Sequence, residues 1–415
     1  MGASPTESLL QNRNAPCRRV SENVPLSIAS HMPLRLGTRH DHASSLPVGS
    51  NVKLVTKRAR DFRSFDVAQT ALLHAQRPSP QTKMHPQVLL KSLFFAMKAE
   101  TRMSESVLVT GGGGFIGTWV LRELLSRGLK PVVYDVQKND ERWQQVLGDA
   151  AEKVVFVKGS LLDRDRLRLT VGANDVSHII HLAALLTPNC QQDPFAGCEV
   201  NVLGSVALFE LARAFAGTIK GISYASSYAV YGPEADDTSL GLTAADNRPP
   251  SFYGAFKMAV DSIAEQYWRH FGIASVGIRP HVAYGPERSV GLTAGPSLAA
   301  RAAALGESYS INYTGRVGYD YVEDVARAFV HSALETPPGS TIVDLPSQLA
   351  TTEEFVAVID RVVPGSGSRI SVDGPSIPSN IPPKPKFISE LFPDWRATTL
   401  EEGVRRTVEF YRRGT

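Results

Sequence analysis

From residue 104 onward, short apolar runs alternate with longer stretches whose apolar residues recur at helical spacing. Six apolar runs are candidate strands, at 107–109, 132–134, 154–157, 178–181, 221–225 and 275–278. Helical patterns lie between them, notably at 116–127, 202–215 and 253–271. Regular alternation of this kind predicts the α/β class, with a doubly wound parallel sheet of the Rossmann type.

The pattern changes after Pro280, where Pro and Gly become more frequent and the apolar runs shorten. Two further helical patterns follow, near 352–363 and 400–412, and a proline-rich connection spans 377–386. We therefore expect a larger domain at 104–280 and a smaller C-terminal α/β part at 281–415.

The first part of the chain, 1–103, shows neither helical nor strand periodicity and is rich in Ser, Pro, Arg and His. We expect a disordered or non-native leader there. It is a transit-type leader, a regulatory tail, or upstream sequence ahead of a working start at Met103. Residues 1–102 carry 15 Lys and Arg against 6 Asp and Glu, so the rest carries 29 against 35. The basic character belongs to the leader, which argues against nucleic acid as a partner of the whole chain.

The amino-acid composition indicates the class of protein and its cellular compartment. Of its 415 residues, 43% are hydrophobic and 20% charged, which is ordinary for a globular protein. Three cysteines, Cys17, Cys190 and Cys198, indicate neither a disulfide framework nor a metal cluster. No uninterrupted apolar run approaches 18 residues, so we expect no membrane span. A cytoplasmic location follows, with organellar targeting by the leader left open.

A glycine-rich turn, TGGGGFIG at 110–117, joins the first predicted strand to the first helix. Gly111 allows a tight bend, Gly114 lets a pyrophosphate approach the backbone, and Gly117 lets the helix pack on the strand. The predicted helix begins at Ile116, directly after Phe115, and its free N–H groups attract phosphate. This spacing predicts a dinucleotide site in the domain at 104–280, and we expect the smaller part at 281–415 to bind substrate.

Asp135 ends the second predicted strand, 18 residues after Gly117. An acid near this distance accepts hydrogen bonds from the adenosine ribose 2′-OH and repels a 2′-phosphate. The sequence therefore favours NAD over NADP, although Lys138 softens that repulsion.

Tyr253 and Lys257 stand four residues apart on a predicted helix and so share a face. An ammonium beside a phenol lowers the phenol's pKa, and such a Tyr exchanges a hydroxyl proton while nicotinamide exchanges hydride. Ser227 follows the fifth predicted strand, where it faces the ligand crevice. We expect Ser227, Tyr253 and Lys257 to be catalytic.

Together these motifs resemble the extended short-chain dehydrogenase/reductase family, in its NAD-dependent epimerase/dehydratase group. The resemblance covers about three quarters of the chain and includes RPHVAYGP at 279–286 and VEDVA at 322–326. It implies that Asp163 meets the adenine, Ala183 lines the nicotinamide side, Asn201 braces the active-site helix and Lys257 holds the nicotinamide ribose. The cofactor-binding set is then Gly111, Gly114, Phe115, Ile116, Gly117, Asp135, Leu162, Asp163, Leu182, Ala183, Ala184, Asn201, Tyr253 and Lys257. In this family the helices expected at 202–215 and 253–271 pair across a two-fold axis, so we expect a homodimer.

Departures from the family pattern narrow the chemistry. Sugar dehydratases of the group carry an acidic pair where this chain has Tyr228 and Ala229. Nucleotide-sugar epimerases carry a phosphate-binding Asn where Val282 stands. They also carry a diphosphate-binding Arg where Val317 stands, with Arg316 one residue off. Dehydration is disfavoured, and a nucleotide diphosphate substrate is in doubt.

The function expected first is an NAD-dependent oxidoreductase that acts on a secondary alcohol or ketone of a sugar, sugar acid or similar small polyol. An alternative is a (nucleotide-)sugar epimerase that retains its NAD; a non-catalytic dinucleotide sensor is less favoured, because a sensor has no use for a proton relay. Candidate substrate contacts are Thr187, Ser227, His281, Arg288 and Arg316. No metal is expected.

Overall fold

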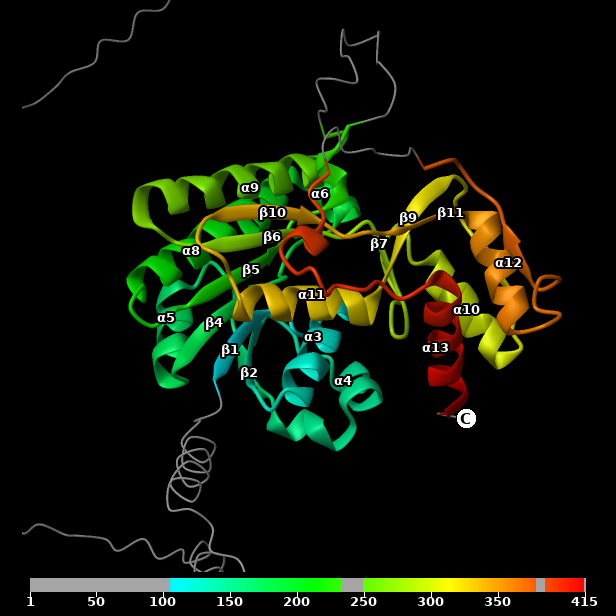
Figure 1. Ribbon diagram of the computed structural model, residues 1–415, viewed down its shortest axis with the longest axis horizontal. Coiled ribbons are helices and arrows are strands. Elements are labelled where there is room, and N and C mark those ends of the chain that lie inside the picture. The colour runs from blue at the N-terminus through cyan, green and yellow to red at the C-terminus, as the bar shows by residue number, and fades with distance from the viewer. Residues whose placement is uncertain (1–104, 233–248, 378–384, 414–415) are drawn as a thin grey trace, which may run out of the picture. The chain divides into compact units, whose positions relative to one another are not determined.

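A seven-stranded parallel sheet, in the order β10-β6-β5-β4-β1-β2-β3, organises the described part of the chain (Figure 1). The computed structural model describes residues 105–232, 249–377 and 385–413. The strands of this sheet are β1 (Ser106–Thr110), β2 (Lys130–Asp135), β3 (Val155–Lys158), β4 (Val176–His181), β5 (Gly221–Ala225), β6 (Ser275–Arg279) and β10 (Ser340–Asp344). The predicted doubly wound sheet is confirmed, and its strand order reverses between β1 and β4, where ligands bind in such folds.

Helices cover both faces of this sheet, because alternate residues of each strand point to opposite sides. Val107 and Val109 of β1 face one core layer, with α3 (Phe115–Ser126) and α11 (Val322–Leu334). Leu108 faces the other layer, with α5 (Arg164–Ala173), α8 (Gly204–Ala214) and α9 (Phe252–Phe271). Short helices complete the connections: α4 (Asp140–Leu147), η1 (Gly148–Lys153), α6 (Thr187–Gln192), α7 (Pro194–Cys198), the π-helix η2 (Glu199–Leu203) and η3 (Tyr228–Val230).

The chain beyond residue 280 builds two small sheets and several helices. A three-stranded sheet has the order β11-β9-β7, and β8 pairs with β12. These elements are β7 (Val282–Tyr284), α10 (Gly295–Leu305), β8 (Tyr309–Ile311), β9 (Arg316–Tyr321), β11 (Gln348–Thr351), α12 (Thr352–Val362), β12 (Ile370–Val372), η5 (Ile388–Glu390) and α13 (Leu400–Arg413). Beyond these, β10 crosses back to pair with β6, so the region after 280 contributes to the central sheet. A division into two domains at residue 280 stays a prediction.

Some predictions fall outside the described residues. The leader at 1–103 does, and so does most of the proline-rich connection at 377–386.

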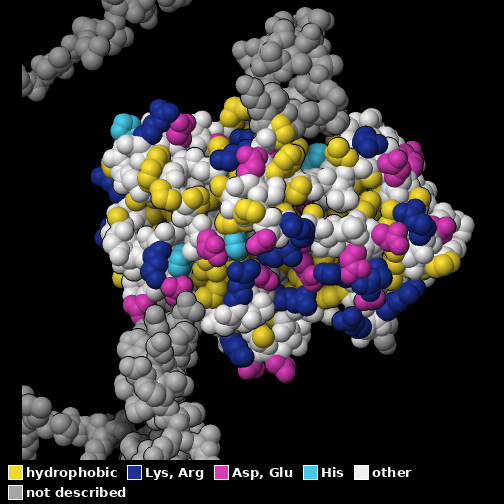
Figure 2. Space-filling view, in the orientation of Figure 1, with side chains coloured by type: hydrophobic (Ala, Val, Ile, Leu, Met, Phe, Trp, Pro, Cys, Tyr) yellow, Lys and Arg dark blue, Asp and Glu magenta, His cyan; other side chains and the backbone are white. Residues whose placement is uncertain are grey.

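On the face in Figure 2, Lys and Arg side chains are interspersed with Asp and Glu rather than gathered by sign.

One continuous helical stretch, Pro194–Ala214, is long and apolar enough by length and composition to cross a membrane. Glu199 and Glu210 interrupt it, which is why no unbroken apolar run marks it in the sequence. Half of its most apolar window is buried, and its η2 and α8 segments pack against α9. A core helix of a globular protein has the same features, so this stretch is weak support for a membrane span.

His181 ties β1, β4 and α8 together at the switch point. Its Nδ1 lies 2.7 Å from Thr110 Oγ1, and its Nε2 lies 3.0 Å from Ser205 Oγ. Burial, with a smaller contribution from the Lys257 charge, lowers the pKa of His181 to about 3. The imidazole is therefore neutral in the folded protein at neutral pH.

We predict that His181 makes the folded state less stable in acid. As the pH falls below 6.5, the unfolded chain binds a proton that the folded chain does not, so stability is lost in this window. Between pH 7 and pH 5 the loss is about 2 kcal/mol. Urea unfolding of His181→Gln at both pH values should show a smaller pH dependence by this amount. The exposed His270→Gln serves as the control, and equal pH dependence in all three proteins would contradict the prediction.

Candidate functional site

The glycine turn between β1 and α3 has no room for side chains at several of its glycines, most clearly where the neighbouring atoms are backbone. Gly111 adopts φ +74°, and a Cβ there would lie 2.6 Å from the Ala183 nitrogen. A Cβ at Gly117 would lie 2.2 Å from the Gly111 carbonyl oxygen. Gly114 caps α3 without a side-chain hydrogen bond, and the first turn of α3 contains no acid. The turn thus offers an open helix N-terminus to phosphate, which fits the diphosphate of NAD.

Asp135 supports this turn from the end of β2. Its Oδ2 accepts a hydrogen bond from Gly113 N at 3.0 Å, and its Oδ1 accepts from Gln137 N at 3.4 Å. A carboxylate has further lone pairs for a ribose hydroxyl. Lys138, which was expected to soften the repulsion of a 2′-phosphate, forms an ion pair with Asp140 at 2.5 Å. Its positive charge is therefore already paired with an acid. The arrangement favours NAD over NADP.

The loop after β4 is fixed directly to β1. Leu182 N donates to the Thr110 carbonyl at 3.1 Å, and Ala183 N donates to Thr110 Oγ1 at 3.3 Å. The next residue, Ala184, is half-buried. The glycine turn and the residues predicted to line the nicotinamide side are therefore brought together at the carboxyl ends of adjacent strands.

Two residues predicted to bind the cofactor lie after β3, and Asp163 is the one expected to meet the adenine. Leu162 is 39% exposed, which leaves an apolar side chain open to a ligand. Asp163 caps α5, where its carboxylate accepts from Arg166 N at 3.0 Å. This cap accounts for Asp163 structurally, and its second oxygen is available to a ligand.

Asn201 lies in the π-helical turn η2 and forms hydrogen bonds with both backbone polar groups of Leu185. Its Oδ1 accepts from Leu185 N at 2.7 Å, and its Nδ2 donates to the Leu185 carbonyl at 2.9 Å and to Cys190 Sγ at 3.4 Å. The resemblance implies that Asn201 braces the active-site helix, whereas these bonds brace the loop after β4. Single π-turns of this kind often occur at functional sites.

The structure brings Ser227, Tyr253 and Lys257 together. Tyr253 lies in the first turn of α9, where its phenol is near enough to Ser227 to interact with it. Lys257 Nζ lies 5.7 Å from the centroid of the Tyr253 ring and donates to the Ala225 carbonyl at 2.6 Å. Gly254 permits the close approach of α9, because a Cβ there would lie 2.0 Å from the Ala229 carbonyl oxygen.

The expectation that Lys257 lowers the pKa of Tyr253 is wrong for this arrangement. Burial raises the pKa of Tyr253 to about 12, and the interaction with Ser227 offsets part of that rise. Burial also lowers the pKa of Lys257 to about 8, against the opposing charge of Asp261. The ammonium lies over the ring and donates to a backbone carbonyl, so it does not contact the phenol oxygen.

A charged network lies behind Lys257, one helical turn further along α9. Asp261 is 5% exposed and its Oδ2 accepts from Arg279 at 2.6 Å and from Ser226 at 2.9 Å. Arg279 also donates to the Tyr231 hydroxyl at 2.6 Å, and that hydroxyl donates to Asp344 at 3.0 Å. Ser226 precedes Ser227, so the network fixes the backbone beside the predicted catalytic hydroxyl.

Sequence reasoning missed two side chains that hold the glycine turn. Trp143 Nε1 donates to the Gly112 carbonyl at 3.1 Å, and Arg142 donates to the Gly113 carbonyl at 3.0 Å. Both belong to α4 and follow no motif spacing. Only tertiary packing brings them to the turn, so no signal in one sequence marks them.

The remaining candidate substrate contacts differ in their surroundings. Thr187 is half-buried at the start of α6. The His281 ring accepts from Gly318 N at 2.6 Å and stacks on Tyr228 at 4.4 Å, and burial lowers its pKa to about 4. This neutral ring is thus engaged in packing. Arg316 is 57% exposed and lies 3.8 Å from Glu354, and no contact joins it to the other site residues that the structure describes.

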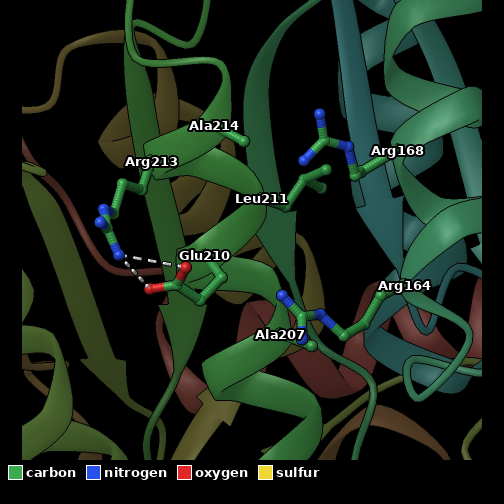
Figure 3. A pocket seen from close by; sticks show the side chains of 7 residues that line it. All are labelled: Arg164, Arg168, Ala207, Glu210, Leu211, Arg213 and Ala214. Carbon is green, nitrogen blue, oxygen red and sulfur yellow. Dashed lines mark hydrogen bonds and ion pairs between the residues drawn. The ribbon is translucent and has the colours of Figure 1, made fainter. Parts of the chain in front are cut away.

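A surface hollow of about 280 Å³ lies between α5 and α8, apart from these residues (Figure 3). Its lining is Arg164, Arg168, Ala207, Glu210, Leu211, Arg213 and Ala214. Glu210 is occupied by Arg213 and by the Tyr267 hydroxyl. None of the predicted site residues lines this hollow, so it is separate from the candidate active site.

Comparison with known proteins is consistent with this geometry. Residues 107–343 match the NAD dependent epimerase/dehydratase family. UDP-glucose 4-epimerase of Mycolicibacterium smegmatis is 29% identical over 321 residues, which cover 74% of this chain and 98% of that protein. UDP-glucuronate 4-epimerase 6 of Arabidopsis thaliana is 33% identical over 186 residues, which cover 44% of this chain but only 40% of the relative.

Solved structures show the same fold. The UDP-glucose 4-epimerase of Thermus thermophilus, in complex with NAD, has a TM-score of 0.61 and 25% identity, covering 74% of this chain and 99% of that one. The L-threonine dehydrogenase of Clostridium difficile also has a TM-score of 0.61, at 18% identity, covering 75% of this chain and 99% of that one. The chain therefore belongs to the NAD-dependent epimerase/dehydratase family and is an NAD-dependent enzyme of the extended short-chain dehydrogenase/reductase type.

Proposed function

We propose that this enzyme oxidises or reduces a secondary alcohol or ketone of a sugar, sugar acid or similar small polyol. The observation that carries the proposal is the contact of Tyr253 with Ser227 above the buried ammonium of Lys257. These three side chains account for proton transfer, while the residues around them determine which substrate fits.

NAD, when bound, supplies the two-electron acceptor or donor for the substrate carbon. Ser227 is placed to hydrogen-bond the reacting oxygen and orient it toward Tyr253. In reduction the phenol of Tyr253 gives its proton to the substrate carbonyl oxygen, and in oxidation the phenolate left by loss of that proton takes the substrate's hydroxyl proton. Lys257 lies over the Tyr253 ring and donates to the Ala225 carbonyl, so it fixes the position of the phenol without contacting the phenol oxygen.

The surroundings support a substrate without a nucleotide diphosphate. Val282 and Val317 stand where nucleotide-sugar epimerases carry an Asn and an Arg, and both are buried in the hydrophobic core. A charge-assisted hydrogen bond contributes about 1.5–3 kcal/mol. Loss of two such bonds weakens diphosphate binding by roughly 3–6 kcal/mol, or about 10²- to 10⁴-fold.

A second candidate is an epimerase that retains its NAD, and the activities named for several relatives favour it. Net oxidation makes NADH accumulate when NAD⁺ and substrate are added, which near-ultraviolet absorbance detects. An epimerase gives no net signal but converts its substrate to the epimer. We expect NADH from sugars or sugar acids; epimerisation of UDP-glucose without NADH would establish the second candidate instead.

We also propose that the protein is a homodimer in a cytoplasmic setting. Leu203 of η2 and Phe252 and Phe271 of α9 are 53%, 47% and 47% exposed. In the family these helices pair across a two-fold axis, which would bury such side chains. The sparse cysteines fit a reducing compartment.

We predict that Tyr253→Phe lowers turnover by roughly 10²- to 10⁴-fold, because the phenol oxygen is the proton acceptor. NAD affinity should stay nearly unchanged, since the aromatic ring is kept. Lys257→Ala should reduce both turnover and NAD affinity, because Lys257 is also expected to hold the nicotinamide ribose. Steady-state rates and NAD titrations check both variants, and undiminished turnover in Tyr253→Phe would rule out this assignment.

We predict that Leu203→Asp converts the dimer to a monomer, because it places a charge in the apolar helix interface. Leu349→Asp is the matched control, since Leu349 is 62% exposed but lies on β11. Light scattering at micromolar concentration measures both. A monomeric parent protein, or equal behaviour of the two variants, would contradict the predicted interface.

A further inference from the structure

Arg288 is a mostly enclosed cation that has no acidic partner among the described residues. It follows β7, and its guanidinium donates to the Ala283 carbonyl and, at 2.7 Å, to Thr293 Oγ1. Both acceptors are neutral. A guanidinium has five N–H donors, so 5 − 2 = 3 of them have no acceptor in the described part of the chain. Arg279, by contrast, pairs with Asp261 at 2.6 Å.

The guanidinium lies where the cofactor turn and the loop after β4 meet. Its central carbon lies 6.0 Å from the ring centroid of Phe115, the first residue of α3. A Cβ on Gly291 would lie 3.7 Å from Arg288 Nη2 and 3.8 Å from Leu186 Cδ1. Leu186 adjoins Leu185, which Asn201 clamps. Arg288 therefore stands at the carboxyl ends of β1 and β4, the ligand crevice of this fold.

The backbone before Arg288 is held by three separate helices. Pro286 carbonyl accepts from Trp119 of α3 at 3.1 Å, and Glu287 carbonyl accepts from Arg142 of α4 at 3.2 Å. Glu287 N donates to the Tyr411 hydroxyl of α13 at 2.7 Å, and Glu287 adopts φ +69°. A non-glycine residue held in this conformation shows that the surrounding contacts fix the loop. The cation is thus positioned before any ligand arrives.

Burial without a counter-charge is costly for a cation. It lowers the pKa of Arg288 to about 10, with a smaller opposing effect from Tyr313, so the guanidinium stays charged at neutral pH. A bound anion would remove this cost.

We propose that Arg288 binds the carboxylate of a sugar-acid substrate, a refinement that rests on the proposed function. The planar guanidinium matches a single carboxylate through two parallel hydrogen bonds. A diphosphate would need further donors, and Val282 and Val317 supply none. The diphosphate of NAD is the other source of negative charge at this crevice, so the experiment separates the two.

The test measures binding by calorimetry on the full-length, NAD-loaded protein, with D-glucuronate and D-galacturonate as probes. D-glucose and D-galactose are their uncharged counterparts. The parent protein should bind at least one acid more tightly than its neutral sugar. Arg288→Met should weaken the affinity for that acid about 10- to 10²-fold and leave the affinities for the neutral sugar and for NAD unchanged. The affinity of Arg288→Lys for the acid should lie between those of the parent and Arg288→Met. Arg361→Met removes an equal charge from an exposed position on α12 and should bind like the parent.

Three results would overturn the proposal. The first is that neither acid binds the parent better than its neutral sugar, and the second is that Arg288→Met weakens NAD, which assigns the cation to the cofactor's diphosphate. The third is that the acid and the neutral sugar lose affinity equally in both Arg288 variants, which indicates a structural role for Arg288. Binding is read without turnover, so an acid that binds through Arg288 but yields no NADH would support the site and refute the proposed oxidoreductase activity.

Discussion

The hydrogen bond from the buried ammonium of Lys257 to the Ala225 carbonyl holds the candidate site together. A charge that is only 5% exposed is costly unless it is compensated, and here the Ala225 carbonyl accepts from it at 2.6 Å while the Asp261 carboxylate attracts it. That bond fixes α9 against the carboxyl end of β5. Tyr253, one turn earlier on α9, is thereby held against Ser227, which follows β5. The absence of a side chain at Gly254 lets the two segments come this close.

A second set of contacts brings the cofactor turn to the same place. Thr110, at the end of β1, holds the loop after β4 through its carbonyl and its hydroxyl, and the same hydroxyl contacts His181. Gly111 approaches Ala183 so closely that no Cβ would fit. Because β1 and β4 flank the reversal of strand order, the crevice above them opens toward ligand rather than being covered by a crossover helix. Cofactor and catalytic side chains thus share one edge of the sheet.

The sequence predicted those parts of the molecule that depend on local spacing. Strand and helix periods located the sheet, the glycine spacing located the turn, and the four-residue spacing placed Tyr253 and Lys257 on one face. What it could not predict depends on distant contacts. Trp143 and Arg142 reach the glycine turn from another helix, and β10 crosses back to β6 from far along the chain.

The electrostatics were beyond sequence reasoning for the same reason. Spacing places Lys257 near Tyr253, but the direction of the Tyr253 pKa follows from burial, which only the packed structure defines. Likewise, nothing local to Arg288 shows that it lacks an acidic partner among the described residues, whereas Arg316 looked equally suitable and is exposed beside Glu354.

The catalytic arrangement rests on a buried Lys257 ammonium, whose pKa is lowered by burial and raised by the nearby Asp261 carboxylate. Nuclear magnetic resonance of protein labelled with ¹³C at the lysine Cε positions measures this directly, by following each signal as the pH is raised. One lysine should titrate near pH 8, below the ordinary value of 10.5, and its signal should be missing in Lys257→Met. If every lysine, Lys257 included, titrates near the ordinary value, the Lys257 ammonium is solvated, which contradicts its burial against the Ala225 carbonyl.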